Sequence, residues 1–542
     1  MRVNDKYKFV IYYLPVLLIV IVALGFFPVR KVADKLSPGF SAERVAEDIK
    51  YISKQPHSIQ HPKERAVVRD YLFHRLENMG AQPQRFAYDS IACKFGGYYD
   101  IENVYAVFNP PMVTDSTKYV LLVAHLDSRY FNVVLKDTVY SYGAADDGYG
   151  LGIILESVGQ ALKYRSEWKQ GIKVLFTDSE EHELDGMTNA VKQDRYLFDH
   201  VNFIVNLEAR GVKGDALLFE TTAGNSAVMD LYKKASNPRG FSLTTLIYNV
   251  MPNDTDFTLL RDSIPGINVA VIENLHYYHT DRDNFSNISK ESIQHYGAQL
   301  EPIMNEYLVS DKYSSATGLV STTDQVFFAF PIIGMFQFTH AQYSVLNIVT
   351  YLLFVVLLLL YIWIKRVKIE RVLKECGYVL LFAVGAFLIG EGIAWLAASA
   401  AGLPFNPVAV KYVKYDNLIA LFTCAALVLV LAAFFKRRAV LDSLLGTLLL
   451  MCIFSFVLYV TVFENFFILL PLLICTLAML AGLCRKLRFL YILSAMLIAL
   501  ISVYFLNLLY IAITIGALGV ILMLGTLSVL IILLQYDCYK EA

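Results

Sequence analysis

The pattern of hydrophobic and polar positions divides the chain into three parts. Phe9–Val29 contains no charged residue, and about 21 apolar positions are enough to cross a bilayer as one helix. The middle of the chain mixes apolar and polar positions as soluble domains do, and long apolar stretches dominate the end. The pattern therefore predicts an N-terminal transmembrane anchor over 1–30, a folded domain over 31–325 and a transmembrane bundle over 326–542.

Seven apolar stretches after residue 339 approach or exceed the length of a membrane span. They are 343–364, 378–401, 417–435, 443–463, 466–483, 488–507 and 510–534. Glu391 lies inside the second of them. An ionisable residue at such depth indicates either a function or a structural role, in which it reaches the outer interface or forms a hydrogen bond within the bundle.

Basic residues flank these stretches unevenly and predict the orientation of the chain. Arg2, Lys6 and Lys8 precede the anchor, and every second connection of the bundle is basic. The positive-inside bias then places both termini in the cytoplasm and the middle domain outside it, in a periplasm or in the lumen of an organelle. A cleaved signal peptide is the alternative for the first stretch, but its apolar run is longer than such peptides usually have.

The middle domain alternates between helical and strand periods. Four nearly continuous apolar runs predict strands that are covered on both faces, namely 119–124, 172–177, 201–207 and 267–272. Amphipathic helical spacing occurs before and between them, as at Val45, Ile49 and Ile52. The expected fold is an α/β sandwich with a largely parallel or mixed central sheet.

Composition agrees with a mixture of soluble and membrane parts. Hydrophobic residues make up 56% and charged residues 18% of the 542, and the formal net charge is -1. This excludes a lone soluble domain, and the near-neutral charge removes the simplest argument for a nucleic acid partner. Cys93 is the one cysteine before residue 370, so the middle domain must be stable without an internal disulfide.

Residues that can carry chemistry gather at the carboxyl ends of the predicted strands, where ligands of open α/β sheets bind. The first segment is His125-Leu126-Asp127, in which both polar side chains point to the same side, so Asp127 can support His125 as a metal ligand. The other segments are Gly143–Gly148, Asp178–Glu183, Asn206–Gly211 and His276–Asp281. Several other histidines lie on amphipathic patterns and are predicted at the surface, among them His57, His74 and His295.

Each segment also has an ordinary structural explanation. One of two adjacent aspartates caps the following helix, and we expect Asp147 to do so while Asp146 points at the site. The acidic run Asp178–Glu183 suits the start of a helix or a solvated face, and Glu208 can pair with Arg210. Carboxylates crowded at the end of a buried strand, however, repel one another unless a cation compensates them.

In their order along the chain, His, Asp, Glu-Glu, Glu, His, these segments resemble the co-catalytic di-zinc aminopeptidase family (clan MH). This group includes bacterial leucyl aminopeptidases, glutamate carboxypeptidase and the glutaminyl cyclases. The layout of anchor, domain and bundle is similar to the endoplasmic reticulum metallopeptidase and vacuolar membrane protease branch. The resemblance covers about residues 40–310, through PHSIQHPKERAVVRDYL, EEHELDGM, NLEARG, NDTDFTLLRDSIPGI and YHTDRDN. It implies a three-layer α/β/α zinc-exopeptidase domain with a mixed central sheet, followed by an all-α multi-pass transmembrane bundle.

The resemblance also implies two zinc ions per chain. Asp146 would bridge them, and the remaining ligands would be His125 and Glu208 for one ion and Glu181 and His279 for the other. The histidine of the last segment is taken as His279 because His-Thr followed by an acidic residue is the family pattern. The ligand at 208 is Glu where many soluble members have Asp.

Two further residues take catalytic roles by this resemblance. Glu180 would be the general base, and Asp127 would stand behind His125. Two divalent ions bring four positive charges and the three ligand carboxylates return three, which leaves about one positive charge to stabilise a hydroxide bridging the metals. Glu180 beside it can take a proton and deliver it to the leaving amine. Asp256 in NDTDF is a candidate for ordering the site.

The leading hypothesis is a membrane-embedded zinc metallo-exopeptidase with an aminopeptidase preference, acting on peptides outside the cytoplasm. Glutaminyl cyclase-like acyl transfer is the first alternative, although cyclases of this type use one zinc and lack the full ligand set. A non-catalytic receptor or transport protein that uses the fold as a scaffold is the second, although such relatives lose metal ligands. The expected partners are a peptide substrate and the lipid bilayer, without nucleic acid; the oligomeric state is left open.

Overall fold

The structure is a computed structural model that describes residues 5–26, 31–94, 96–250, 254–331, 333–406, 409–436 and 438–540. The chain divides into two compact units. The sheet unit comprises Val29–Ala329 and Ile333–His340, and the helical unit comprises Met1–Pro28, Phe330–Ile332 and Ala341–Ala542. The end of the predicted anchor at Val29 lies outside the described residues. The β10–β11 hairpin after residue 325 thus belongs largely to the sheet unit.

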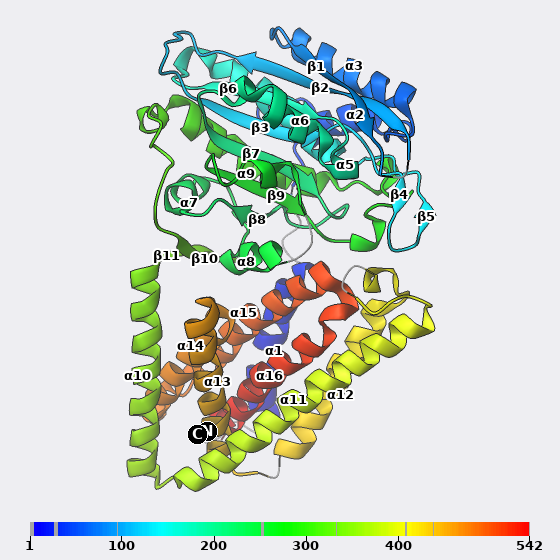
Figure 1. The fold of residues 1–542 in the computed structure, drawn as a ribbon. Helices are drawn as coiled ribbons and strands as arrows, with labels where there is room; N and C mark the ends of the chain where they lie inside the picture. The colour runs from blue at the N-terminus through cyan, green and yellow to red at the C-terminus, as the bar shows by residue number, and fades with distance from the viewer. Residues whose placement is uncertain are drawn as a thin grey trace. The chain divides into compact units, whose positions relative to one another are not determined.

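The sheet unit is built on a seven-stranded mixed sheet (Figure 1). Its order is β1-β2-β6-β3-β7-β9-β8, in which β6, β3, β7 and β9 are parallel and the two edges are antiparallel. The bounds are β1 Gln84–Ala92, β2 Tyr98–Phe108, β3 Tyr119–His125, β6 Gly171–Thr177, β7 Val201–Ala209, β8 Leu217–Thr221 and β9 Gly266–Val271. The four parallel strands are those that the apolar runs predict.

Helices cover both faces of the sheet, so the predicted α/β/α architecture is confirmed. Side chains of β3 alternate between two hydrophobic cores: Val120 and Leu122 enter one, Leu121 and Val123 the other. The first core is closed by α2 Ala42–Ile52, α3 Pro62–Asn78, α4 Gly148–Ala161, α7 Ser226–Tyr232 and α9 Lys290–Val309. The second is closed by α6 Asp185–Gln193 and the 3₁₀ helix Asp256–Leu259.

The remaining elements of the sheet unit are short. Besides further 3₁₀ helices, they are α5 Glu180–Glu183, α8 Ser242–Val250, the hairpin of β4 Phe131–Asn132 and β5 Asp137–Thr138, and the hairpin of β10 Gln325–Phe330 and β11 Gly334–Thr339.

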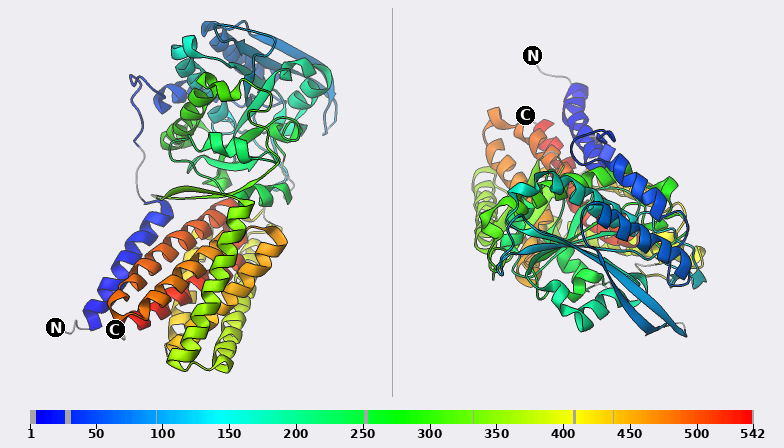
Figure 2. Two further views of the ribbon diagram at one scale, coloured as in Figure 1. Left: turned by 90° about the vertical axis from the view of Figure 1, so that its left-hand side faces the viewer. Right: turned by 90° about the horizontal axis from the view of Figure 1, so that it is seen from above.

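The helical unit consists of long apolar helices that run side by side (Figure 2). They are α1 Asp5–Ile21, α10 His340–Lys365, α11 Ile369–Ala400, α12 Asp416–Phe435, α13 Val440–Val462, α14 Phe466–Gly482, α15 Leu490–Ile513 and α16 Leu518–Lys540. Within the described residues, six spans are long and apolar enough to cross a membrane when Leu490–Lys540 counts once, and α14 is shorter. Each apolar stretch of the sequence therefore corresponds to a helix.

Glu391 participates in the packing of α11 against α16. A Cβ atom at Gly390 would lie 2.6 Å from the Cα of Gly519, so the two helix backbones approach closely. The Glu391 carboxylate accepts a hydrogen bond from the backbone N–H of Gly519, near the start of α16. The hydrogen bond within the bundle, one of the expectations for Glu391, is therefore observed.

The close approach of α9 to the segment before α2 generates a stability prediction. A Cβ atom at Gly297 would overlap the buried ring of Phe40, whereas one at Gly159 in α4 would meet nothing within 4 Å. We expect Gly297→Ala to destabilise the sheet unit by about 1–3 kcal/mol through overpacking. Gly159→Ala should instead stabilise it, by at most about 1 kcal/mol, because alanine is the better helix former. Thermal unfolding of the two variants measures both effects, and equal shifts would contradict the packing argument.

Candidate metal centre

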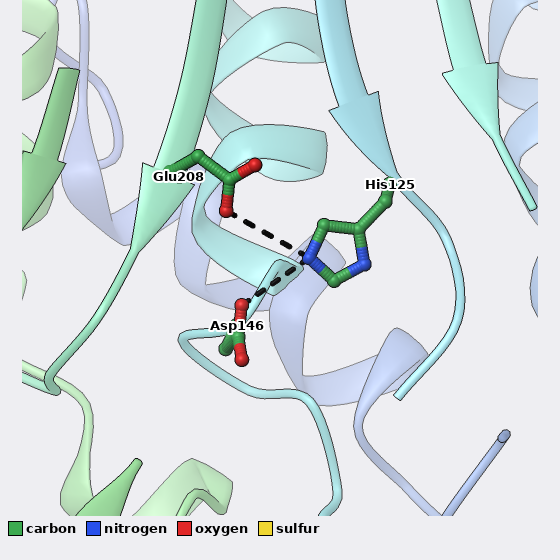
Figure 3. Close-up of side chains that lie close together, drawn as sticks. All are labelled: His125, Asp146 and Glu208. Carbon is green, nitrogen blue, oxygen red and sulfur yellow. Dashed lines mark hydrogen bonds and ion pairs between the residues drawn. The ribbon is translucent and has the colours of Figure 1, made fainter. Parts of the chain in front are cut away.

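The first group of predicted ligands lies at the carboxyl edge of the sheet. His125 ends β3, Glu208 lies near the end of β7, and Asp146 lies in the loop before α4 (Figure 3). The Nε2 atom of His125 is 3.2 Å from Asp146 Oδ1 and 3.9 Å from Glu208 Oε2. One donor atom from each of the three residues lies within 4.8 Å of the other two, a spacing that can hold one metal ion.

The second group uses the other oxygen of Asp146. His279 Nε2 is 3.4 Å from Asp146 Oδ2 and 3.0 Å from Glu181 Oε2. These three residues also offer donor atoms within 4.8 Å of one another, and His276 belongs to neither group among the described residues. Asp146 therefore faces both groups, one oxygen to each, and the arrangement has room for two ions with this carboxylate between them.

Asp127 is connected to both the histidine and the acidic pair. Its carboxylate accepts hydrogen bonds from the backbone N–H groups of Glu180 (2.9 Å) and Glu181 (3.3 Å), which begin α5. The ring of His125 lies closer to the backbone oxygen of Asp127, 3.0 Å from Nδ1, than to its carboxylate, at 3.5 Å. Asp127 thus supports His125 partly through its carbonyl group, which leaves Nε2 facing the site.

The two adjacent aspartates divide their roles as the sequence predicts. Asp147 is the N-cap of α4 and accepts a hydrogen bond from the backbone N–H of Gly150 at 2.9 Å. Asp283, which the sequence analysis did not single out, accepts hydrogen bonds from the N–H groups of Ala145 (2.7 Å) and Asp146 (3.2 Å). It lies in the motif YHTDRDN, but only the folded structure reveals that it holds the loop of Asp146.

The acidic run Asp178–Glu183 is divided between structure and site. Asp178 is fully buried and lies 3.2 Å from Arg65 and 3.6 Å from Arg69, so it is a structural ion pair. Glu183 pairs with Lys94 at the surface. Of the four acidic residues in the run, only Glu180 and Glu181 are therefore candidates for a role in the metal centre.

Two of the histidines predicted at the surface are buried, so that prediction is wrong for them. His57 is 1% exposed; its backbone N–H donates to Ser128 Oγ, and its Nδ1 lies 3.0 Å from the carbonyl oxygen of Gln55. His295 is also 1% exposed and accepts a hydrogen bond from the N–H of Ala216 at Nδ1. Both are satisfied by the backbone, which an amphipathic pattern does not reveal. His74 is exposed, as expected.

The electrostatics of the centre favour bound cations. Burial, and then the charge of Glu181, raises the pKa of Asp146, and burial raises that of Glu180. Burial raises the pKa of Glu208 to about 7, and Asp256 nearby adds to the shift. Burial acts in the same direction on Glu181, but the charges of His279 and Arg129 hold the pKa of this carboxyl below its ordinary value.

The donor set fits divalent metal ions such as zinc. It contains imidazole nitrogen and carboxylate oxygen only, and zinc accepts both. Glu181 Oε1 is buried without a hydrogen-bond partner in the described part of the chain, as expected for an oxygen that is available to a cation. Arg129, which lies 3.3 Å from Glu181 Oε2, supplies one positive charge beside a cluster of four carboxylates.

This arrangement can hold metal ions, and comparison with known sequences points to a family of peptidases. Residues 103–304 match the profile of the family described as Peptidase family M28. This part of the chain is therefore similar to a known peptidase family.

The chain is also similar to proteins that are named as proteases. The chain is 28% identical over 327 residues to "Endoplasmic reticulum metallopeptidase 1" of Rattus norvegicus, an alignment that covers 56% of this chain and 34% of the relative. It is 27% identical over 285 residues to "Vacuolar membrane protease" of Candida glabrata, which covers 48% of this chain and 28% of the relative. The chain therefore spans about a third of the length of these curated relatives.

Solved structures with similarity to this chain include a glutaminyl cyclase of Porphyromonas gingivalis, with 21% identity and a TM-score of 0.40 over 50% of this chain and 99% of that one. A Zn-dependent exopeptidase from Parabacteroides distasonis has 20% identity and a TM-score of 0.40, over 49% of this chain and 98% of that one.

The raised pKa values predict how stability depends on pH without metal. Groups whose pKa is raised on folding, such as Glu208 at about 7, stabilise the fold at low pH, and this contribution is lost as pH rises through the folded value. We expect the chelated protein to have a lower Tm at pH 8 than at pH 5.

Added zinc should reverse this dependence, because the ligands bind metal in their deprotonated form. Thermal unfolding at both pH values, with chelator and with zinc, measures the effect. Glu208→Gln should reduce the pH dependence of the chelated protein. A zinc-induced rise in Tm that is the same at both pH values would contradict the account.

Proposed function

We propose that this chain is a membrane-embedded zinc aminopeptidase that hydrolyses peptides on the extracytoplasmic side of its membrane. The observation that carries the proposal is the sharing of Asp146 between two complete ligand groups, with Glu180 next to the ligand Glu181 in sequence. The full set of five ligands supports hydrolysis over glutaminyl cyclisation and over a scaffold without activity.

Glu180 has the environment that a general base requires. Zinc ions bound to the two ligand groups would supply Lewis acidity that lowers the pKa of water and polarises the scissile carbonyl. Asp127 fixes the backbone of Glu180 by accepting its N–H. Burial raises the pKa of Glu180. The pKa of this carboxyl thus comes closer to that of the water that it deprotonates and of the amine that it protonates. Glu180 then takes a proton from the attacking water and passes it to the leaving amine.

Tyr278 and Arg129 complete the surroundings of the second ligand group. The ring of Tyr278 stacks on the imidazole of His279, with 3.6 Å between ring centroids, and so restricts its orientation. Burial, and then the charges of Asp146 and Glu181, raises the pKa of Tyr278, so the phenol remains a hydrogen-bond donor at neutral pH. Arg129 Nη1 donates to the backbone oxygen of Glu181 and holds the start of α5 from the other side.

A position in a cellular membrane is supported by the helical unit and by the relatives. Six apolar spans occur among the described residues, and the relatives are named for the endoplasmic reticulum and the vacuole. Lys8 Nζ donates to the backbone oxygen of Lys540 at 2.8 Å, so both ends of the described chain lie at the same end of the helical unit. This supports the proposed topology with both termini in the cytoplasm.

Glu180→Gln tests the proposed base. The amide cannot take up the proton, so we expect kcat to fall about 100- to 10,000-fold while zinc content stays that of the wild type. The measurement is hydrolysis of a panel of peptides that differ in their N-terminal residue, together with metal analysis of the purified full-length protein.

The matched control is Glu183→Gln in the same short helix. Glu183 is paired with Lys94 at the surface rather than directed at the centre, so this variant should keep its activity. Equal turnover by wild type and Glu180→Gln would remove Glu180 from its role. Activity on N-terminally blocked peptides alone would contradict the aminopeptidase assignment.

A further inference from the structure

A row of buried polar side chains crosses three strands and ends at a predicted metal ligand. The polar ladder consists of Glu208 and Asn206 on β7, Asn268 on β9 and Glu220 on β8. Asn206 and Asn268 are direct partners in the strand register, as are Asn268 and Glu220. All four are at most 6% exposed. The ladder lies on the same face of the sheet as Ile204, which belongs to the second core. Apolar side chains would be expected on this face.

Hydrogen bonds connect the ladder from end to end. Asn206 Nδ2 donates to Glu208 Oε1 at 3.3 Å and to Asn268 Oδ1 at 3.0 Å. Asn268 Nδ2 donates in turn to Glu220 Oε2 at 3.1 Å and to Thr255 Oγ1 at 2.9 Å. Both amide hydrogens of each asparagine are therefore used.

The network fixes the orientation of the Asn206 amide. In the opposite orientation its carbonyl oxygen would face Glu208 Oε1 and Asn268 Oδ1, which are both acceptors. In the observed orientation Asn206 Oδ1 is buried without a hydrogen-bond partner in the described part of the chain. A buried acceptor without a partner costs folding free energy, so stability alone does not explain an asparagine at position 206.

The consequence of this orientation falls on the two oxygens of Glu208. Its Oε1 atom is held by Asn206, while Oε2 is directed at Nε2 of His125 (Figure 3). A carboxylate that is held at one oxygen presents the other in a fixed direction and loses less freedom when it binds a cation.

We propose that Asn206 and Asn268 are positioning residues of the metal centre, which set the affinity of the ion at His125, Asp146 and Glu208. The inference rests on the proposed di-zinc function. Glu181 and His279 do not belong to the ladder, so the ion that they would hold should be affected much less, and only through the Asp146 that the two groups share. Through Thr255, the ladder also holds the start of the 3₁₀ helix that carries Asp256.

Asn206→Leu in the full-length, detergent-solubilised protein tests the proposal. Leucine has a similar shape but no donor, so we expect one of the two zinc ions to bind about 10- to 100-fold more weakly and the affinity of the other to change much less. The measurement is a zinc titration of the metal-free protein against a competing chelator of known affinity. Hydrolysis should return when the zinc concentration is high enough to refill the weakened site.

Asn202→Leu is the matched control. Asn202 is also buried on β7, and its amide donates to the backbone oxygens of Tyr313 (3.0 Å) and Ser315 (3.1 Å), away from the centre. This variant should lose stability yet bind both zinc ions with wild-type affinity. Should Asn206→Leu not fold, Asn268→Leu removes the next step of the ladder and should weaken the same ion by a smaller factor.

The outcomes separate this inference from the proposed function. If wild type hydrolyses peptides and Asn206→Leu binds both ions like wild type, or no more weakly than Asn202→Leu, the positioning role is wrong and the function stands. If wild type binds two ions without hydrolysing any peptide, the function is wrong and the titration still decides the role of the asparagines. A wild type that binds fewer than two ions overturns both.

Discussion

Repulsion between buried carboxylates is the constraint on which the rest of this structure depends. Asp146, Glu180, Glu181 and Glu208 meet at one edge of the sheet, where burial already disfavours their charged forms. Bound cations would relieve this repulsion, and the surrounding structure limits how far the carboxylates can move apart. Asp127 and Arg129 fix α5, Asp283 fixes the loop of Asp146, and the polar ladder fixes Glu208.

The central strands were predictable from sequence, whereas the edges of the sheet were not. Strands β3, β6, β7 and β9 are covered on both faces and read as continuous apolar runs, which few other elements produce. Strand β1 is exposed at most of its positions, and β2 and β8 do not stand out as such runs. Their pairing with the centre depends on long-range contacts that a local pattern does not contain.

The candidate metal ligands could be predicted from the ends of the strands and from the order of the motifs. His125, Glu181, Glu208 and His279 end apolar strands or lie in the segments that follow them, so their convergence follows from the topology, whereas Asp146 is placed by the loop before α4. The supporting residues were not found, because they depend on strand register and loop contacts. Asn206 faces Asn268 only once β7 and β9 pair. Asp178 can be assigned to a structural ion pair, and not to the site, only when its contact with Arg65 is known. His57 and His295 show the converse error, because backbone partners allow histidine to be buried.

The position of Asp146 between the two ligand groups has a consequence for how the centre fills. If each group binds an ion, the first ion would neutralise and orient a carboxylate that the second ion also needs. The charge of the first ion would at the same time repel the second. The two binding steps would therefore be thermodynamically coupled, and neither affinity would depend on three residues alone. We expect a preparation with one zinc per chain to be a mixture of distinct species rather than a uniform half-loaded enzyme.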